Sequence, residues 1–235
     1  MKNRISLKSN LHFLLTVLLI TFVSLLSNAQ ISGLELSAGG RMTTLDGNNL
    51  RLNQLSSLGE DNRLGGDVFS KIHINLGANW IKIAPEVFFI QNGTQETHNN
   101  VGTVSQNLIN GKIRMNYSGI SIPLAINIPI KKNGNTYAIE LYGSGFADYA
   151  VSGSYTDLNG KKTDLSFGEG TTDRMDWGIS TGLGFMVNGL VIRAGYDKGL
   201  KEIEFVGAST NGQPSPTNVK NTGFFATIGF MTTIN

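Results

Sequence analysis

Eight segments of the chain alternate apolar and polar residues with a period of two, and this repeat restricts the possible folds more than any other feature. A period of two puts successive side chains on opposite faces of a β-strand, whereas an amphipathic helix repeats every 3.6 residues. The segment from Ile120 to Ile130 is the clearest, because every second residue is Ile or Leu. The pattern predicts an all-β protein whose strands each have one apolar and one polar face.

The apolar faces of the eight expected strands carry no charge, and the charged residues share the opposite faces. The apolar faces are Leu34, Leu36 and Ala38; Ile72, Ile74 and Leu76; Ile81, Ile83, Val87 and Phe89; Ile120, Ile122, Leu124, Ile126, Ile128 and Ile130; Tyr137, Ile139, Leu141, Ala147, Tyr149 and Val151; Trp177, Ile179, Leu183, Phe185 and Val187; Leu190, Ile192, Ala194 and Tyr196; and Phe224, Ala226, Ile228 and Phe230. The polar faces hold the acids Glu35, Glu86, Glu140, Asp148, Asp176 and Asp197 and the bases Arg41, Lys71, Lys82 and Arg193. A charge on the lipid side of a barrel costs about 2–4 kcal/mol near the bilayer midplane. This distribution therefore predicts a barrel with an apolar exterior and a narrow polar lumen in which opposite charges pair.

The connections between these segments alternate strictly between long and short. Residues 43–66, 92–111, 157–173 and 199–220 are long and polar, whereas 77–79, 131–136 and 188–189 are short. Asn188-Gly189 is a strong signal for a two-residue hairpin. Bacterial transmembrane barrels have an even number of strands, short periplasmic turns and longer outer loops. We therefore expect an eight-stranded antiparallel up-and-down transmembrane β-barrel with both termini in the periplasm.

Two details qualify the strand pattern. Pro85, Pro123 and Pro129 fall within expected strands, where the missing N–H requires a bulge or a break in the ladder. Arg114, Asn116 and Ser118 occupy every second position, and the same series of positions becomes apolar from Ile120 onward. This change indicates either a bulge or the point at which the strand emerges from the membrane. Five aromatic residues fall near strand ends, as interfacial girdles do: Tyr117, Tyr137, Tyr149, Trp80 and Trp177.

The first 29 residues have the layout of a secretory signal peptide. Lys2, Arg4 and Lys8 precede an apolar run over 13–26, and Ala29 ends a short polar segment suited to cleavage. Its removal leaves 16 bases and 17 acids, so no basic excess favours nucleic-acid binding. No later run is apolar enough for a transmembrane helix. We expect a signal peptide over 1–29, a barrel domain over 30–235, and location in the outer membrane as a multi-pass barrel.

Several short motifs occur in a consistent order along the chain. They are Ala84 to Phe89 (APEVFF) with Gly93, Ile120 to Leu124 (ISIPL), Gly182 to Phe185 (GLGF), Arg193 to Leu200 (RAGYDKGL), and a closing segment from Asn221 to Phe230. In these motifs the chain resembles the PorT-like outer-membrane β-barrel proteins of the Bacteroidetes, over nearly all of its length after the signal peptide. The resemblance implies an outer-membrane barrel and, for the namesake, a part in protein secretion. Family members usually carry an acid at the position of Ser121.

The sequence predicts no catalytic, cofactor-binding or metal-binding residues, and its binding residues are unknown. Residues 178–182 match the G-x-S-x-G pattern, but the nucleophile Ser180 would lie inside a strand and no His follows it. His73 is expected to point into the lumen and join a charge network, and His98 lies in a long loop. The chain has no Cys, and its loop acids lack the spacing of an EF-hand. We therefore expect no cofactor.

Three functions remain open at this stage. The first is a non-enzymatic scaffold or interaction protein in the outer membrane, with a plugged polar lumen, contacts to outer-membrane lipid and, by resemblance, to protein secretion components. The alternative is an exported soluble ligand-binding barrel of the lipocalin kind. The third is an outer-membrane enzyme, whose Ser, His and acid groups would have to gather near the outer rim around His98.

Overall fold

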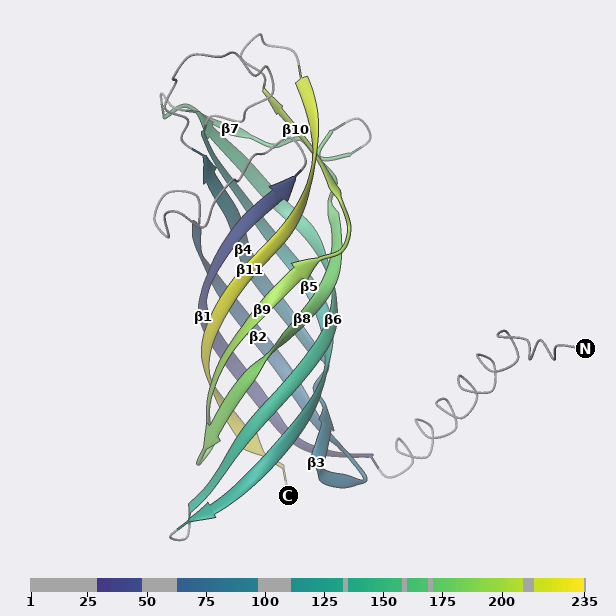
Figure 1. Cartoon of the computed structure of the whole chain (residues 1–235), viewed down its shortest axis with the longest axis vertical. Helices are drawn as coiled ribbons and strands as arrows, with labels where there is room; N and C mark the ends of the chain where they lie inside the picture. Colours follow the sequence, from purple (N-terminus) through teal and green to yellow (C-terminus); the bar gives the residue numbers. More distant parts are fainter. Residues whose placement is uncertain are drawn as a thin grey trace, which may run out of the picture.

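Eight long strands form one closed antiparallel ring (Figure 1). The computed structural model describes residues 29–47, 63–96, 111–132, 135–157, 160–168, 171–208 and 214–234. The ring consists of β1 (Ala29–Gly47), β2 (Arg63–Leu76), β4 (Glu86–Glu96), β5 (Gly111–Lys132), β6 (Asn135–Asp157), β8 (Met175–Val187), β9 (Leu190–Gly199) and β11 (Pro214–Thr233). Strands that follow one another in this series pair side by side, and β1 closes the ring by pairing with β11. The eight-stranded antiparallel barrel expected from the sequence is confirmed.

The third wall strand is divided at Pro85, where the sequence predicts a bulge or a break. Its lower part, β3 (Ala78–Ile83), pairs with β2 and β5, and β4 continues the wall after a break at Ala84-Pro85. Pro85 has no N–H to donate, but its carbonyl oxygen accepts a hydrogen bond from the N–H of Ile72 at 3.0 Å. The break therefore keeps the wall closed while it accommodates the proline.

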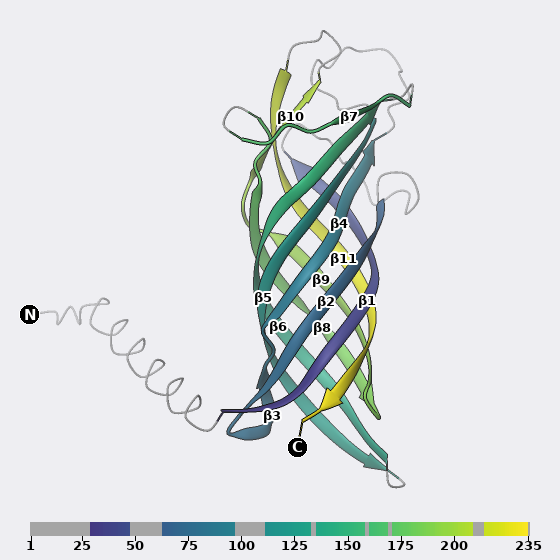
Figure 2. The same cartoon turned by 180° about the vertical axis from the view of Figure 1, so that it is seen from behind.

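Short and long connections lie at opposite ends of the barrel (Figures 1 and 2). The end that carries the C-terminus, called the lower end here, holds the short turns at Gly77 and Asn188-Gly189 and the paired strand ends Lys132 and Asn135. Asn188 and Gly189 both have positive φ, 49° and 88°, as a tight hairpin of this type requires. The connections at the upper end are shorter than the sequence predicts, because strands β1, β2, β4 and β11 continue into the ranges predicted as loops. Two further short strands, β7 (Lys162–Asp164) and β10 (Ile203–Ala208), lie in these connections.

An apolar belt surrounds the outside of the barrel. Every wall strand contributes large exposed apolar side chains to it, among them Leu36, Ile72, Val87, Ile122, Leu141, Leu183, Ile192 and Ile228. The outward residues of β5 from Ile120 to Ile130 are all 42–59% exposed. The predicted inward acids and bases face the lumen instead, and Glu35, Glu140, Asp148 and Asp176 are 1–2% exposed. This is the inside-out distribution of transmembrane barrels. Within the described ranges, we find no helix that has both the length and the apolarity to cross a membrane.

Two residues differ from the faces that the sequence predicts. Leu76, expected on the exterior, is 2% exposed, because the register between β2 and β3 shifts between Asn75 and Leu76. Tyr117, expected in an aromatic girdle, is completely buried in the lumen, because it belongs to the inward phase of Ile113 and Met115. Of the other girdle candidates, Trp80, Tyr149 and Trp177 are 44–51% exposed, and Tyr137 is partly exposed.

The bulge expected near residue 118 is present, but it lies in β6. Asn116 pairs with Ser152 and the next residue, Tyr117, pairs with Ala150, so Val151 is the extra residue. The outward phase of β5 does not change, since Arg114 and Ser118 are exposed on the same face as Ile120. The polar residues therefore lie above the apolar belt on a strand that continues beyond it.

Glycines of β8 and β9 make room for aromatic side chains inside the narrow lumen. A Cβ atom at Gly182 would lie 2.5 Å from the hydroxyl oxygen of Tyr142 and 2.4 Å from the carbonyl oxygen of Ala194. Both distances are far below van der Waals contact. The small inward residues of the G-x-S-x-G match are thus explained by packing.

We expect Gly182→Val to reduce the folded fraction sharply, because overpacking of this kind typically costs about 1–3 kcal/mol. Gly145→Ala is the matched control, because nothing lies within 4 Å of the Cβ it would add. The yield of folded barrel, measured by gel mobility without boiling, should fall for Gly182→Val alone. Equal yields for both variants would contradict the packing explanation.

Candidate functional site

The lower half of the lumen contains a compact network of buried charges. The Arg193 guanidinium lies between two carboxylates, with its Nε 2.6 Å from Glu140 Oε1 and its Nη2 2.9 Å from Glu35 Oε2. His73 Nε2 lies 2.8 Å from the same Glu35 Oε2. All four side chains are at most 3% exposed. Because each buried charge has a partner of opposite sign or a hydrogen bond, the network fills the lumen without isolated ions.

A second ion pair lies in the middle of the lumen. Lys71 Nζ lies 2.6 Å from Glu86 Oε2, and the Ser121 hydroxyl donates to the other oxygen of Glu86. The Lys71 ammonium also lies 5.4 Å from the centre of the Phe69 ring. The pair comes from two neighbouring strands, because Lys71 of β2 and Glu86 of β4 are directly opposite in the register.

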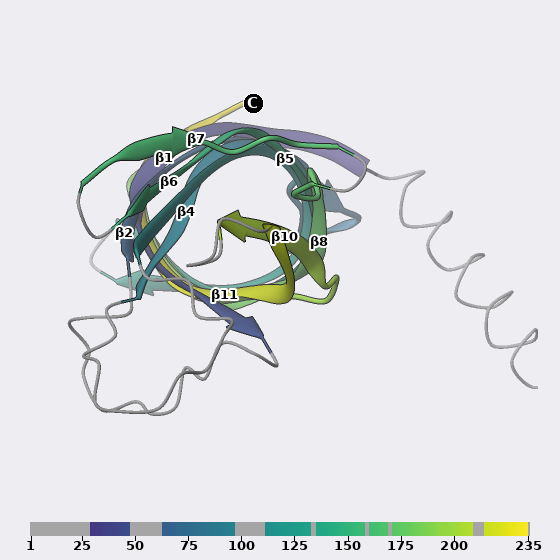
Figure 3. The ribbon, with the colours of Figure 1, turned by 90° about the horizontal axis from the view of Figure 1, so that it is seen from above.

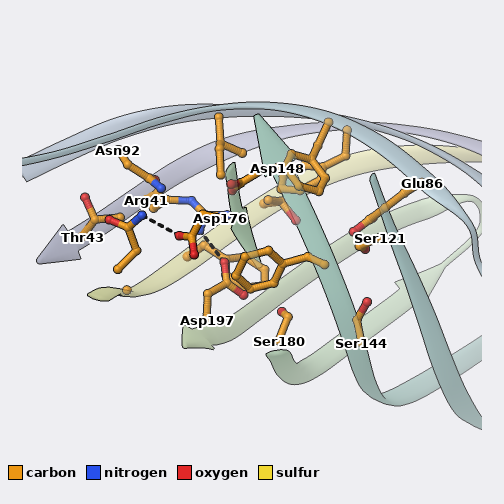
Figure 4. Close-up of a pocket in the computed structure, with 18 of the residues that line it drawn as sticks. Arg41, Thr43, Glu86, Asn92, Ser121, Ser144, Asp148, Asp176, Ser180 and Asp197 are labelled. Carbon is orange, nitrogen blue, oxygen red and sulfur yellow. Dashed lines mark hydrogen bonds and ion pairs between the residues drawn. The ribbon is translucent and has the colours of Figure 1, made fainter. Parts of the chain in front are cut away.

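The third network lies above these pairs and contains more acid than base. Arg41 Nε lies 3.1 Å from both carboxylate oxygens of Asp67, and its Nη1 donates to Asp197 Oδ2. The guanidinium carbon is 5.4 Å from the centre of the Phe225 ring. Figure 4 shows Arg41 and Asp197 together with Asp148, Asp176 and Asn92 around one cavity.

Asp148 and Asp176 face this cavity from neighbouring strands, and neither forms an ion pair with a base in the described part of the chain. They are directly opposite each other in the register of β6 and β8, and both are buried. Asp176 accepts hydrogen bonds from Asn221 Nδ2 at 2.7 Å and from the Trp177 N–H at 2.8 Å. The Oδ1 atom of Asp148 is buried without a hydrogen-bond partner. Like charges directly opposite in a sheet repel, so this pair requires compensation.

Apolar side chains close the upper end of the lumen. The cluster inside the wall contains Phe69, Phe88, Ile90, Ile113, Met115, Tyr117 and Ala150, and Ile203 of β10 joins it with 1% of its surface exposed. Leu165 and Phe167 pack against the cluster from the connection after β7. Seen from above, β10 lies within the ring of wall strands (Figure 3). We call Leu165, Phe167 and Ile203 the mouth plug.

Hydrogen bonds and an ion pair hold the mouth plug in place. The Asp173 N–H donates to the Glu204 carbonyl oxygen at 2.9 Å, and the Asp173 carboxylate accepts from the Glu204 N–H at 3.3 Å. Lys201 Nζ lies 3.2 Å from Asp173 Oδ2 and donates to the Met175 carbonyl oxygen. The two upper connections are therefore bonded to each other across the mouth.

Sequence reasoning placed the ten charged residues correctly in the lumen but missed several of their partners. Asp67 was assigned to no strand face, although it shares the inward phase of Phe69 and Lys71 and is 2% exposed. That phase could have identified it. Asn92, Tyr142 and Asn221 also line the lumen. Tyr142 shares the inward phase of Glu140, which could have identified it. Asn92 and Asn221 lie at the edges of the predicted loops, where a single uncharged residue carries little information about its face.

The other candidate residues have ordinary surroundings in the described part of the chain. Ser180 lies inside β8 and faces Ser144 and Asp197 across the sheet, so the strand–turn–helix context of a nucleophile elbow is missing. No group of three or more His, Asp or Glu side chains in the described ranges is arranged to hold a metal ion. His98 and the predicted signal peptide lie outside the described residues, apart from Ala29, which begins β1.

The chain is similar in its overall course to small bacterial surface proteins of known structure. Ail, the attachment invasion locus protein of Yersinia pestis in complex with the heparin analogue sucrose octasulfate, gives a TM-score of 0.42 at 13% identity, over 86% of this chain and 100% of Ail. Neisserial surface protein A gives 0.41 at 13% identity, over 86% and 97%. No protein-family model matches the chain, and no curated protein matches it. At these scores we transfer neither partners nor function from the two proteins.

Proposed function

We propose that this protein is an integral outer-membrane β-barrel that acts as a sealed, non-enzymatic scaffold or interaction protein. The observation that carries the proposal is the apolar belt around a polar lumen, which holds networks of buried charged side chains and is covered by the mouth plug. A soluble protein would expose charge on the outside and bury apolar side chains within. An eight-stranded barrel is just wide enough for its own side chains to fill.

The size of the belt supports membrane insertion. From Ile120 to Ile130 the outward residues of β5 are all apolar, which corresponds to roughly 33 Å along a strand with a rise of about 3.3 Å per residue. At a tilt of about 40° this becomes roughly 25 Å along the barrel axis, the height of the apolar band in outer-membrane barrels. Trp80 and Trp177 are exposed where the polar interface of a bilayer would lie.

The proposed orientation follows from the two ends of the barrel. The short turns, the start of β1 and the end of β11 lie at the lower end, so we place both termini in the periplasm. The mouth plug and the long connections then face the outside of the cell. They offer the surface for protein partners, whereas outer-membrane lipid contacts the belt.

The resemblance to PorT-like proteins is what supports a link to protein secretion, and we keep that link as the narrower form of the proposal. The family acid that Ser121 replaces would lie beside Glu86, to which the Ser121 hydroxyl donates here. Glu86 alone pairs with Lys71 in this chain. At this position the lumen of this chain therefore contains one acid, Glu86, where a relative with a second acid in place of Ser121 would contain two.

The lipocalin-like alternative requires the opposite distribution of side chains. A soluble ligand-binding barrel has an apolar cavity for its ligand and a polar exterior. Here Ile192 is 47% exposed on the outside, and the neighbouring Arg193 is 3% exposed inside. We therefore favour the membrane barrel.

Gel mobility of the detergent-extracted envelope, with and without boiling, tests the proposal directly. We expect the protein in the outer-membrane fraction, with a band that shifts on boiling, because a barrel whose wall strands are hydrogen-bonded around a closed ring resists detergent until it is heated. A protein found soluble in the periplasm without a shift would contradict the membrane barrel. A deletion strain then tests the secretion link, which predicts fewer secreted proteins in the medium.

Planar-bilayer recording tests whether the lumen is sealed. We expect no stepwise conductance from the purified wild-type protein, because the charge networks and the mouth plug fill the lumen. Regular conductance steps that persist across preparations would show an open path and would exclude the sealed scaffold, although not the membrane barrel itself.

A further inference from the structure

The charges of the lumen balance in its lower half but not beneath the mouth plug. In the lower and middle networks, Arg193, Lys82 and Lys71 face three carboxylates, those of Glu35, Glu140 and Glu86. In the upper network, Arg41 is the only base among the described lumen residues, and it faces four carboxylates, those of Asp67, Asp148, Asp176 and Asp197. The loop base Lys201 is already bonded to Asp173. If all four acids are ionised, the described side chains of the upper lumen carry three more negative charges than positive ones.

Most of the orphaned polar atoms that line the cavity are carboxylate or amide oxygens. Besides the Tyr142 hydroxyl and the Glu86 Oε2 that is ion-paired with Lys71, four buried oxygen atoms have no hydrogen-bond partner: Oδ1 of Asn92, Asp148, Asp197 and Asn221. Asn92 and Asn221 are only 4% and 6% exposed, and their amide oxygens are neutral acceptors. Buried acceptors are almost always satisfied in folded proteins, so this concentration calls for a donor or a cation. The orphaned amide oxygens of Asn92 and Asn221 are independent of the charge excess and line the same cavity. Figure 4 shows Asn92 in this cavity with Asp148 and Asp176.

We propose that the upper lumen binds one hard divalent cation, Ca²⁺, between the carboxylates of Asp148 and Asp176. The amide oxygens of Asn92 and Asn221 complete the set of oxygen ligands. Ca²⁺ takes carboxylate and amide oxygens in flexible geometry, whereas Mg²⁺ demands near-ideal octahedral coordination. The site contains no His or Cys among its described residues, so it does not suit zinc or copper.

The cavity and its charge suit an ion of this size. Its volume of about 40 Å³ exceeds the roughly 10–15 Å³ that a single water molecule requires on the same measure, so an ion fits together with bound water. A divalent ion would offset the repulsion between Asp148 and Asp176, which face each other directly across β6 and β8. The site has only two carboxylate side chains, and its other two protein ligands are amides. It is therefore not one of the clusters of three or more His, Asp or Glu side chains, which are absent from the described residues. Because the mouth plug covers the cavity, the ion enters when the barrel folds.

Refolding with and without calcium tests this proposal. The full chain is unfolded in urea and refolded into detergent micelles in the presence of CaCl2 or of EDTA. Bound metal is then measured by elemental analysis after gel filtration, and the unfolding temperature by tryptophan fluorescence. We expect close to one Ca²⁺ per chain and a higher unfolding temperature after refolding with CaCl2, because a ligand that binds only the folded state stabilises it.

Two conservative variants and one control locate the ion. Asp148→Asn and Asp176→Asn should each weaken Ca²⁺ binding by at least about tenfold and remove the rise in unfolding temperature. In EDTA, Asp148→Asn should be at least as stable as the wild type, because one uncompensated buried charge is gone. Asp164→Asn, on exposed β7, should bind Ca²⁺ like the wild type.

Two results would overturn the proposal. If the wild type retains no Ca²⁺ and unfolds at the same temperature in both buffers, protons neutralise the acids. If both variants retain Ca²⁺ like the wild type, the ion is bound elsewhere. Because the heat-dependent gel shift reports folding separately, a failure to bind Ca²⁺ leaves the proposed membrane barrel intact.

Discussion

Replacing Arg193 by methionine lowers the free energy of unfolding by about 3–5 kcal/mol, the usual cost of removing one partner from a buried ion pair. Arg193 is the base that contacts both Glu35 and Glu140. Its removal takes away the guanidinium with which both buried carboxylates form ion pairs. The long apolar side chain of methionine keeps much of the volume, so the loss reports mainly on charge. Urea unfolding of the protein in detergent micelles measures the effect.

Two further variants separate charge from packing. Adding Glu35→Gln to Arg193→Met should recover most of the lost stability, because one base and one carboxylate are then removed together and Lys82 still compensates Glu140. Lys220→Met is the matched control, because the Lys220–Glu202 pair at 3.5 Å is exposed and such pairs contribute about 0–1 kcal/mol. A loss for Arg193→Met as small as that of Lys220→Met would mean that water compensates the lower network.

Leu183→Arg is expected to destabilise the protein in a lipid bilayer by about 2–4 kcal/mol, the cost of a guanidinium facing lipid near the midplane. Leu183 is 58% exposed and lies on β8 between outward Ile179 and Phe185, within the apolar belt. The measurement is urea unfolding in lipid vesicles, followed by the gel mobility of unboiled samples.

Leu200→Arg makes the same change above the belt, beyond the upper end of β9. Leu200 is 40% exposed, so the two sites start from similar exposure. We expect a cost of about 0–1 kcal/mol there, as is typical near the interface. If both substitutions are equally well tolerated in vesicles, the belt does not face lipid and the lipocalin-like alternative becomes the better explanation.

Much of the wall could be predicted because the face of a strand residue depends on local alternation. Ile120 to Ile130 and the inward Glu140 and Asp148 follow directly from a period of two. The errors fall where the period is interrupted, as at Leu76, where the register shifts. Tyr117 differs for another reason. Its residue type is typical of a membrane interface, but its position in the alternation, shared with Ile113 and Met115, directs its side chain into the lumen.

The partners within the lumen were not predictable, because they depend on closure of the ring. Arg193 and Glu35 are 158 residues apart in the chain and meet only because β11 lies between β1 and β9. The mouth plug is a similar case. Ile203 lies in a short segment with Phe205 and Val206 inside a connection that is otherwise mostly polar, and nothing in this segment indicates that Ile203 fills the end of the lumen.

By itself, the sequence determined the class of fold, the number of wall strands, the inside and outside of each and the end at which the long loops lie. These properties follow from side-chain alternation and turn residues, which act over a few residues. Only the tertiary structure decided which charges pair, where acid exceeds base and how the upper end is closed. Those outcomes depend on strand order and register, which bring distant residues into one narrow, water-poor space where every buried charge needs a partner.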